Sequence, residues 1–528
     1  MESLQNWLYA AASPVFLSLC IAALVWIHLR DSINYWSKRG VPHIPAHRCL
    51  VLLLAEKFGW KHDMEMYCDM YKALERHSYG GAFEVLKPTI ILRDPAMVNA
   101  WLVKGFSSFR DHHSGSAPDE EGENLTGELF ALTGDRWRQV RSKLTPLFSP
   151  AKLKLMYETL QECTDELKDH LRRTVDDEAD VEIKDVVSRH AMDVIGACAL
   201  GVKCNAINDP ENCMIMKVAN RVLDVGWRSS VYFFLNLVHP RLPHLLGFSL
   251  RSPEVVAFMT SLTKDVMRMK KESEQPSQNF LQMLMDSCEL QEDEIHGAKT
   301  SSSQQELGAV RKESFKITED YVAGVFASFL SAGLEPISII VTCCFYELAH
   351  HPEIQDRVFN EIQTIKEGSG SDITFEDLKK LQYLEQVVKE TLRKYPTAGF
   401  IHRECTEPFH IPDSSIVVEK GVRLFISTCG LQRDPKYFPE PDKFDPDRFS
   451  KENIHKIVPG SYLPFGEGPR VCVGKQLALM NIKHMVMNLV SDYTLQTCEK
   501  TQSCLRTDPQ KFFLGPKGEV WLRLKKRK

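Results

Sequence analysis

One cysteine in the sequence has a context that suits chemistry. Cys472 lies at the end of a glycine-rich loop, Phe465–Gly474, and a helix is predicted directly after it, at about 475–491. The amino terminus of a helix favours a thiolate, and Gly474 lets a flat ligand approach the backbone closely. These features suit a thiolate that ligates a haem iron axially and pushes electron density toward O–O cleavage. A turn with a buried, inert cysteine is the alternative.

Further residues have a spacing that predicts a shared helix face or an anion partner. Glu390 and Arg393 are three positions apart, so they can form an ion pair on one face of a helix. Trp137 and Arg141 are four positions apart and also share a face. Arg470 stands close to the cysteine, where its guanidinium can pair with an anionic group. Spacing alone leaves open that the ion pair is a solvated surface bridge.

At these residues the chain resembles the cytochrome P-450 family of haem-thiolate monooxygenases. The family pattern F-x-x-G-x-R-x-C-x-G is complete at Phe465, Gly468, Arg470, Cys472 and Gly474. The resemblance extends along most of the chain through W-x-x-x-R, E-x-x-R and P-x-R-F elements, which are Trp137–Arg141, Glu390–Arg393 and Pro446–Phe449. It implies haem b as the cofactor, with Cys472 as the proximal iron ligand. In overall wording the chain looks closest to insect microsomal members.

The resemblance also implies roles for the other motif residues. Four of them would contact the haem propionates, for which bidentate arginine is suitable: Trp137, Arg141, Arg403 and Arg470. Arg403 is identified by its place seven residues after Pro396. The ion pair of Glu390 and Arg393, completed by Arg448, would be structural and would lock the segment that positions the cysteine loop.

The chain departs from the family in the helix that should line the oxygen pocket. The family motif is A-G-x-[DE]-T-[TS], and this chain has Ala332-Gly-Leu-Glu-Pro-Ile337. The acid is present at Glu335, but Pro336 replaces the threonine that guides protons in the family. Proline has no N–H for the carbonyl of Ala332 and crowds it, so we expect the helix to kink or open there. The freed carbonyl could hold a water, whereas Ser338 faces about 200° away.

Glu335 and Pro336 are therefore the candidate catalytic residues, and three functions stay open. The first is a monooxygenase whose oxygen chemistry is weakly coupled to product, or whose protons arrive through water or substrate. The second is a haem-thiolate isomerase or dehydratase that acts on an oxygenated lipid without NADPH. The third is a non-catalytic haem-binding protein, if Pro336 abolishes oxygen chemistry.

These residues need a large, mainly helical scaffold with a small β portion. Amphipathic stretches predict long helices at about 151–175, 252–290, 318–350 and 352–367. Strand-like runs are short and lie at Gly81–Leu92, Ser415–Val418 and Arg423–Ser427, and a short β end should follow the final helix. The polar segment Gly297–Glu313 is predicted to be an exposed connection. Because the motifs serve one site, we expect a single haem domain over 46–528.

Composition excludes several classes of protein. The chain has 528 residues, with 65 basic and 70 acidic side chains and a formal net charge of −5, which argues against a nucleic-acid partner. Hydrophobic residues make up 43%, so the chain is neither disordered nor a protein of many membrane spans. The 15 cysteines are an odd number without C-x-x-C spacing, so a disulfide framework or a zinc ribbon is not expected.

The amino-terminal segment determines the predicted compartment. No charged residue lies between Glu2 and Arg30, and Trp7–Ile27 is long enough to span a bilayer as a helix. Basic residues follow the apolar run, so the positive-inside rule places the remainder in the cytosol. We expect a membrane anchor at 1–30, in the endoplasmic reticulum, and a basic, proline-containing linker at 31–45. A cleaved signal peptide is the alternative.

Electrons and substrate must come from outside the chain. The sequence has neither a G-x-G-x-x-G after a strand nor a P-loop pattern, so it shows no nucleotide site of its own. The resemblance implies an NADPH–cytochrome reductase as partner, with cytochrome b5 as a second donor, and a lipophilic small-molecule substrate. Phe106 and the loop up to Phe130 would contact that substrate, and Trp227–Leu250 is either core or a lid in the membrane.

Overall fold

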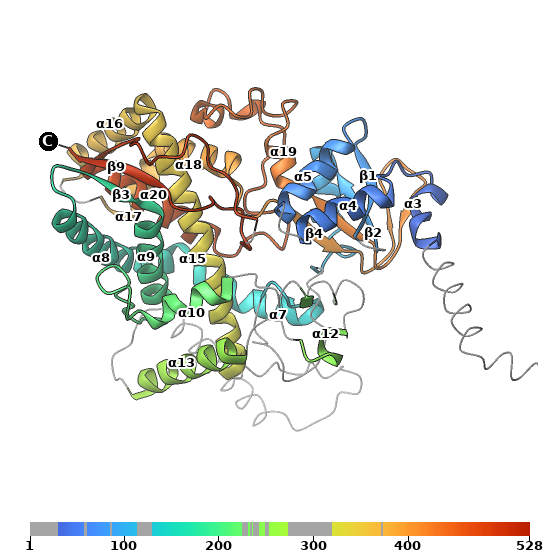
Figure 1. Ribbon diagram of the computed structural model, residues 1–528, viewed down its shortest axis with the longest axis horizontal. Coiled ribbons are helices and arrows are strands. Elements are labelled where there is room, and N and C mark those ends of the chain that lie inside the picture. The colour runs from blue at the N-terminus through green and yellow to red at the C-terminus, as the bar shows by residue number, and fades with distance from the viewer. Residues whose placement is uncertain are drawn as a thin grey trace, which may run out of the picture.

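The computed structural model describes eleven stretches of the chain, which are residues 30–57, 61–84, 87–112, 129–223, 231–232, 235, 242–248, 253–272, 319–370, 373–509 and 511–527. The predicted anchor therefore lies outside the described residues except for Arg30, and so do Gly297–Glu313 and most of Trp227–Leu250. Figure 1 shows a helical part on one side, a smaller part built on a sheet on the other, and the long helix α15 between them.

Helices dominate the described residues, as the sequence predicts. They are α3 (Tyr35–Lys38), α4 (Ala46–Lys57), α5 (Asp63–Ala73), α6 (Pro95–Asn99), α7 (Gly134–Leu144), α8 (Pro150–Thr174), α9 (Ile183–Ile195), α10 (Met214–Leu223), α12 (Leu242–Leu245), α13 (Pro253–Glu272), α15 (Glu319–His350), α16 (Pro352–Ser369), α17 (Phe375–Lys380), α18 (Gln382–Lys394), α19 (Thr428–Gln432) and α20 (Lys475–Asp492). The predicted helices at 151–175, 318–350, 352–367 and 475–491 are confirmed. The prediction for 252–290 is confirmed up to Glu272 and lies outside the described residues beyond it.

The principal sheet has four strands in the order β1-β2-β7-β4. Its strands are β1 (Tyr79–Glu84), β2 (Lys87–Leu92), β7 (Arg423–Ile426) and β4 (Ile401–Glu404). The run predicted at Gly81–Leu92 forms two antiparallel strands, and β7 joins β2 in parallel. The outer strand β4 pairs antiparallel with β7 and carries Arg403 opposite Leu424. A site residue therefore lies on the edge of the sheet.

Two smaller sheets complete the β structure of the described residues. Strands β3 (Glu178–Glu182), β9 (Trp521–Lys526) and β8 (Tyr493–Gln496) pair antiparallel in that order, and β5 (Phe409–His410) pairs with β6 (Val417–Val418). The β end predicted after the last helix is thus confirmed as β8 and β9.

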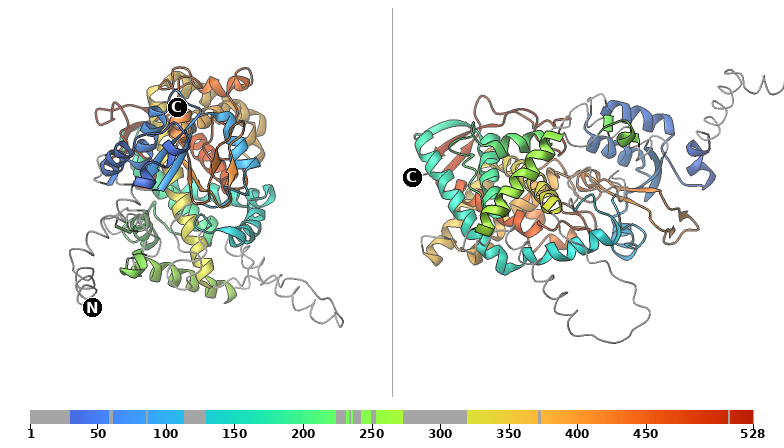
Figure 2. Two further views of the ribbon diagram at one scale, coloured as in Figure 1. Left: turned by 90° about the vertical axis from the view of Figure 1, so that its right-hand side faces the viewer. Right: turned by 90° about the horizontal axis from the view of Figure 1, so that it is seen from below.

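Two hydrophobic cores lie side by side. The larger one is formed by side chains of helices α7–α10, α13, α15–α18 and α20, and the smaller one packs around the four-stranded sheet with α4 and α5. The right-hand view in Figure 2 shows the helical part and the part built on the sheet next to each other. The cysteine loop and the edge strand β4 come from the two different parts, so the site residues must meet where these parts join.

Helix α15 is the central element of the larger core. It packs against α9, α18 and α20. Among the described residues it alone is long and apolar enough to span a membrane, at Val322–His350, but most of that stretch is buried within the protein. Helix α15 does not open at Pro336, because it continues as one α-helix from Glu319 to His350 with the proline inside it, and a kink at that position stays a prediction. Packing on several sides compensates for the one backbone hydrogen bond that proline removes.

The predicted ion pair on α18 is confirmed and is fully enclosed. Arg393 donates from Nε and Nη2 to the two carboxylate oxygens of Glu390, at 2.7 and 2.9 Å, and neither side chain has exposed surface. Arg448, in the short 3-10 helix Pro446–Phe449, lies 3.4 Å from the same carboxylate. Arg393 also donates to the carbonyls of Gln432, Pro441 and Lys443, so the trio holds the irregular segment that leads to the cysteine loop.

We predict that Glu390→Gln lowers the free energy of unfolding by about 3 to 5 kcal/mol, because it leaves the enclosed charge of Arg393 uncompensated. Urea unfolding monitored by circular dichroism measures the loss. Glu376→Gln on the preceding helix, α17, is the matched control. Its carboxylate is 63% exposed and pairs with the exposed Lys379 at 3.1 Å, so its loss should cost less than about 1 kcal/mol. Equal losses in the two variants would contradict the prediction.

Candidate functional site

Tight backbone turns hold Cys472 in place. Its N–H donates to the carbonyl of Phe465 at 3.0 Å, and the N–H of Val471 donates to the carbonyl of Gly468 at 3.0 Å. Two glycines of the loop, Gly466 and Gly468, have φ angles of +78° and +75°, which other residues rarely adopt. Helix α20 begins immediately after the loop at Lys475.

Position 468 requires glycine for a second reason besides its backbone conformation, which is the close approach of another segment of the chain. A Cβ atom at this position would lie 2.3 Å from the carbonyl oxygen of Leu102, whereas one at Gly466 would meet nothing within 4 Å. Leu102 belongs to the smaller core. The glycine therefore lets the loop press directly against the backbone of the other part of the molecule.

Competing effects act on the thiol of Cys472. The side chain keeps accessible surface, yet enough protein surrounds it that burial raises its pKa. A hydrogen bond from the N–H of Gly474 and the charges of Arg141 and Lys475 act in the opposite direction. The helix terminus thus contributes as expected but does not prevail over burial. A metal ion that binds the sulfur removes this penalty, because a coordinating thiol is deprotonated.

Arg470 is anchored on three sides. Nε donates to the carbonyl of Arg110 at 2.8 Å, and Nη2 donates to the carbonyl of Leu132 at 2.9 Å and to Oδ1 of Asp111 at 3.1 Å. Its guanidinium lies over the ring of Trp137, 4.3 Å from the centroid. Nη1 is buried without a hydrogen-bond partner. Burial lowers the pKa of Arg470 to about 10, against the opposing effect of Asp111.

Arg403 is more completely enclosed. Its Nη1 donates to its neighbour's carbonyl, on His402, at 2.7 Å, and it lies 3.2 Å from Nδ1 of His112. Burial lowers the pKa of Arg403 to about 9, and the positive charge of Arg470 lowers it further. No carboxylate lies within ion-pair distance of Arg403 among the described residues.

The predicted helix that carries Trp137 and Arg141 is α7. Trp137 is buried and contacts the ring of Phe106, 5.7 Å away between centroids. Arg141 is half-buried, which lowers its pKa, and the nearby Cys472 acts in the opposite direction. The structure thus brings five predicted residues together, namely Cys472, Arg470, Arg403, Trp137 and Arg141.

The charges of this group suit a ligand that carries carboxylates. Arg403, Arg470 and Arg141 are wholly or partly withdrawn from water, and Asp111 is the one carboxylate that pairs with any of them among the described residues. Enclosed cations need anionic partners, and the buried Nη1 of Arg470 still has a proton to donate. The residues present therefore fit the two propionates and the iron of a haem.

The other two predicted residues lie on a different element, α15. Glu335 and Pro336 keep some accessible surface, as does Ala332 one turn earlier, whereas the helix is buried from Ile337 to Ala349. Ser338 donates to the carbonyl of Leu334 at 2.8 Å and is buried. The expectation that Ser338 does not replace the missing alcohol is thus consistent with its hydrogen bond.

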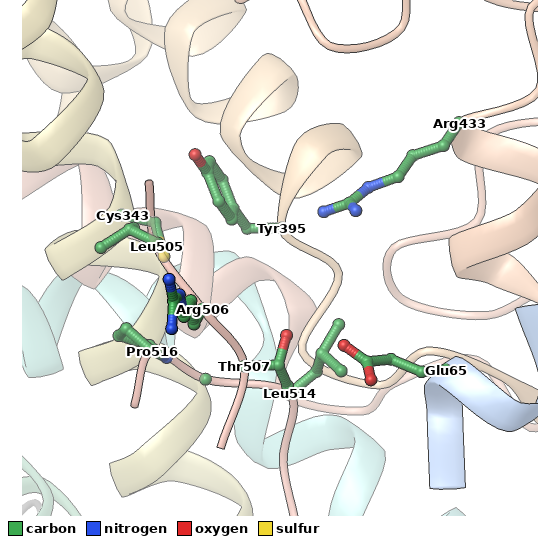
Figure 3. A pocket seen from close by; sticks show the side chains of 10 residues that line it. Glu65, Cys343, Tyr395, Arg433, Leu505, Arg506, Thr507, Leu514 and Pro516 are labelled. Atoms are coloured by element: carbon green, nitrogen blue, oxygen red, sulfur yellow. The ribbon is translucent and has the colours of Figure 1, made fainter. Parts of the chain in front are cut away.

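A polar cavity of about 340 Å³ lies elsewhere, beside the carboxyl-terminal half of α15. Figure 3 shows Arg433 and Glu65 reaching toward it from different elements, with Cys343 on α15 at its wall. None of the predicted site residues lines it. Among the described residues, no group of three or more His, Cys, Asp and Glu side chains could hold a metal ion.

Sequence analysis did not identify Asp111 and His112. Both contact predicted arginines, although the sequence separates them from those arginines by about 290 to 360 positions. No motif or helical spacing marks them, and they fall in the loop region assigned only to substrate contact. An invariant pairing across homologues is the kind of signal that could have found them.

Comparisons with known proteins match the chain to one family. A family model described as Cytochrome P450 matches residues 56–523. Cytochrome P450 9e2 from Blattella germanica is 31% identical, over 100% of this chain and 99% of the relative. Cytochrome P450 6k1 from the same organism is 28% identical, over 93% of this chain and 92% of its own length. Probable cytochrome P450 6a13 from Drosophila melanogaster is 29% identical, with 96% and 98% covered.

We predict that Gly468→Ala destabilises the protein more than Gly466→Ala. Both substitutions force alanine into the left-handed region, which costs about 1 to 2 kcal/mol. Only Gly468→Ala also drives a methyl group into the carbonyl of Leu102, which adds ~1 to 3 kcal/mol and displaces the loop. Urea unfolding and the alkylation rate of Cys472 measure the two effects. Identical behaviour of the variants would show that the contact with Leu102 does not constrain the loop.

Proposed function

The chain belongs to the cytochrome P450 family of haem-thiolate monooxygenases, and on that basis we propose that it oxidises lipophilic small molecules with electrons from NADPH. Its cofactor is haem b with an axial cysteine thiolate, which supplies the activation of molecular oxygen. The observation that carries the proposal is the convergence on one site of a cysteine in a glycine-rich loop, two enclosed arginines, Arg403 and Arg470, and the half-buried Arg141. The proposed substrates are foreign or endogenous lipophilic compounds.

Cys472 is the residue that we assign to the iron. Its support is the loop geometry, the N–H of Gly474 near the sulfur, and the positive charge of Arg141. Both interactions favour the deprotonated form that metal binding needs. Because Gly474 has only Phe148 within 4.0 Å of a built Cβ position, a planar cofactor can pass close to the backbone there.

We assign the propionates to Trp137, Arg141, Arg403 and Arg470. The arginines supply positive charge that is already withdrawn from water, so an anion binds them without a large further desolvation of the protein. Trp137 stacks on Arg470 and limits its rotation. An anion that pairs with Arg403 and Arg470 raises the pKa values that burial lowers, and so stabilises the charged form of both side chains.

In this proposal, Glu335 and Pro336 determine how protons reach the oxygen that the haem binds. Pro336 offers neither a hydroxyl nor an N–H, so the carbonyl of Ala332 lacks its usual helical partner. That carbonyl and the carboxyl of Glu335 can hold water on the part of α15 that keeps accessible surface. Water then takes the place of the threonine hydroxyl found in the family motif.

A redox partner must deliver the electrons, and α7 offers a surface for it. Arg136 and Arg138 are exposed on this helix, while Arg141 on the same helix lies near Cys472. A basic surface beside the cofactor suits an acidic reductase and steers its approach. An NADPH–cytochrome reductase is the proposed donor and cytochrome b5 a second one.

The proposed location is the membrane of the endoplasmic reticulum. An apolar anchor at 1–30 and a linker at 31–45 would hold the haem domain, 46–528, on the cytosolic side. Lipophilic substrates partition into that membrane, so the anchor keeps the site close to its substrate.

We predict that reduced, CO-treated membranes containing the protein show the absorption band of a cysteine-thiolate haem. Cys472→Ala should abolish the band, because no other thiol occupies the loop. Cys504→Ala is the control, since Cys504 is also exposed but lies outside the site. Absence of the band in the unaltered protein, or its persistence in Cys472→Ala, would overturn the assignment.

We predict that Pro336→Thr raises the amount of product formed per NADPH consumed, because threonine restores a hydroxyl and a backbone N–H. Parallel measurement of NADPH loss and product, with added reductase and a panel of lipophilic substrates, gives the ratio. Ser338→Ala is the control and should leave the ratio unchanged, since that hydroxyl is engaged by Leu334. An unchanged ratio in Pro336→Thr would refute the hypothesis of weak coupling.

Pro336 also favours a second candidate function, a haem-thiolate isomerase or dehydratase that needs no proton relay of this kind. Turnover of an oxygenated lipid in the absence of NADPH and reductase would identify it. The same assay without any turnover, combined with a normal CO band, would favour a protein that binds haem without catalysis.

A further inference from the structure

The segment Arg110–His112 holds the two most enclosed arginines of the site. The carbonyl of Arg110 and the carboxylate of Asp111 accept from Arg470, at 2.8 and 3.1 Å. The next residue, His112, faces Arg403 at 3.2 Å. Three consecutive residues therefore fix two guanidinium groups that come from the cysteine loop and from the edge strand β4.

Asp111 also contacts two elements besides Arg470, namely α7 and β4. Oδ1 also accepts from the N–H of Gly134, the first residue of α7, at 2.9 Å. Its backbone carbonyl accepts from the N–H of Glu404 at 2.9 Å, which adds the segment to the free edge of β4 as an antiparallel bridge. One residue thus links β4, α7 and the cysteine loop, the three elements that carry the predicted propionate partners.

His112 can only act as a neutral acceptor. Burial holds the pKa of its ring well below the usual range, and the charge of Arg403 lowers it further. The ring is packed against Phe130, 4.2 Å between centroids, and against His402, 5.1 Å away. A protonated ring would place a third positive charge beside Arg403 and Arg470, so neutrality is required for the contact.

The anchors leave part of the Arg470 guanidinium for another partner. Arg470 uses Nε and Nη2 on the protein, and its buried Nη1 has no partner. Asp111 neutralises one of the two charges, so the pair retains a net positive charge. A rigid fork with a free N–H group and uncompensated charge binds a carboxylate with little loss of entropy.

We propose that Asp111 and His112 are positioning residues, which hold Arg470 and Arg403 in the orientation that binds the haem carboxylates. This inference rests on the proposed function of the site. Neither residue touches the iron in this scheme. They act through the two arginines, as outer-shell partners orient the ligands of a metal.

The test is the rate at which the purified ferric holoprotein loses haem to excess apomyoglobin. Asp111→Asn removes the charge that fixes Arg470, and His112→Phe keeps a packed ring but removes the acceptor for Arg403. Each should accelerate haem loss roughly 10- to 100-fold, the range typical of outer-shell partners. Asp135→Asn is the matched control, because that carboxylate is 81% exposed and lies 3.8 Å from Arg110. It should change the rate less than about twofold.

Two further measurements separate positioning from a general loss of structure. The propionate bending bands in resonance Raman spectra should shift in Asp111→Asn and His112→Phe but not in Asp135→Asn. In a double-mutant cycle, Asp111→Asn combined with Arg470→Lys should lose haem no faster than Arg470→Lys alone, because Asp111 acts through that arginine.

Failure of the proposed function and failure of the positioning role give different results. If the unaltered protein shows no thiolate-haem band with CO, the proposed function fails. If that band is present, but Asp111→Asn and His112→Phe lose haem at the rate of Asp135→Asn with unshifted bands, the positioning role is overturned. Additive effects in the double-mutant cycle would also overturn it for Asp111.

Discussion

Positive charge withdrawn from water is the constraint on which the site depends. Arg403 and Arg470 are enclosed, and burial lowers the pKa of each guanidinium, to about 9 and about 10. Such charges are tolerable only where hydrogen-bond acceptors and an anion face them. The protein meets this need partly with backbone carbonyls and with Asp111, and the remainder is left for a ligand. The same interactions join the helical part of the molecule to the part built on the sheet, so binding and architecture share one set of contacts.

The cysteine loop is held by contacts just before it and within it. Gln432 is fully buried, donates to the carbonyl of Leu392 at 3.0 Å and accepts from the N–H of Leu463 at 2.9 Å, which ties the start of the loop to α18. Gly468 contacts the backbone of Leu102 directly. The enclosed trio around Glu390 holds the irregular segment that leads to the loop. A thiolate ligand gains from such preorganisation, because little entropy remains to be lost on binding.

The sequence predicted those parts of the site that short-range spacing or a family motif defines. Trp137 and Arg141 share a helix face, and Glu390 and Arg393 form the pair that their spacing indicates. Long-range partners could not be predicted, because nothing local distinguishes Asp111 or His112 from other polar loop residues. The helix at Pro336 shows the opposite limit, since a strong local preference for a break was outweighed by the packing of α15. Local rules fail where tertiary contacts supply more free energy than the local term, about 3 kcal/mol for an interior proline.

The uninterrupted α15 also changes what Pro336 means for the proposed chemistry. A broken helix would have replaced the threonine by an open backbone with several free groups, whereas the continuous helix frees only the carbonyl of Ala332. Ala332 is exposed and Glu335 is half-buried, so the two residues lie where α15 is least covered. The family motif supplies a hydroxyl, which both donates and accepts a hydrogen bond, but a carbonyl only accepts. In the proposed function, proton transfer along this stretch would therefore begin from water or from a protonated Glu335, and the acid of the motif would matter more where its alcohol is absent.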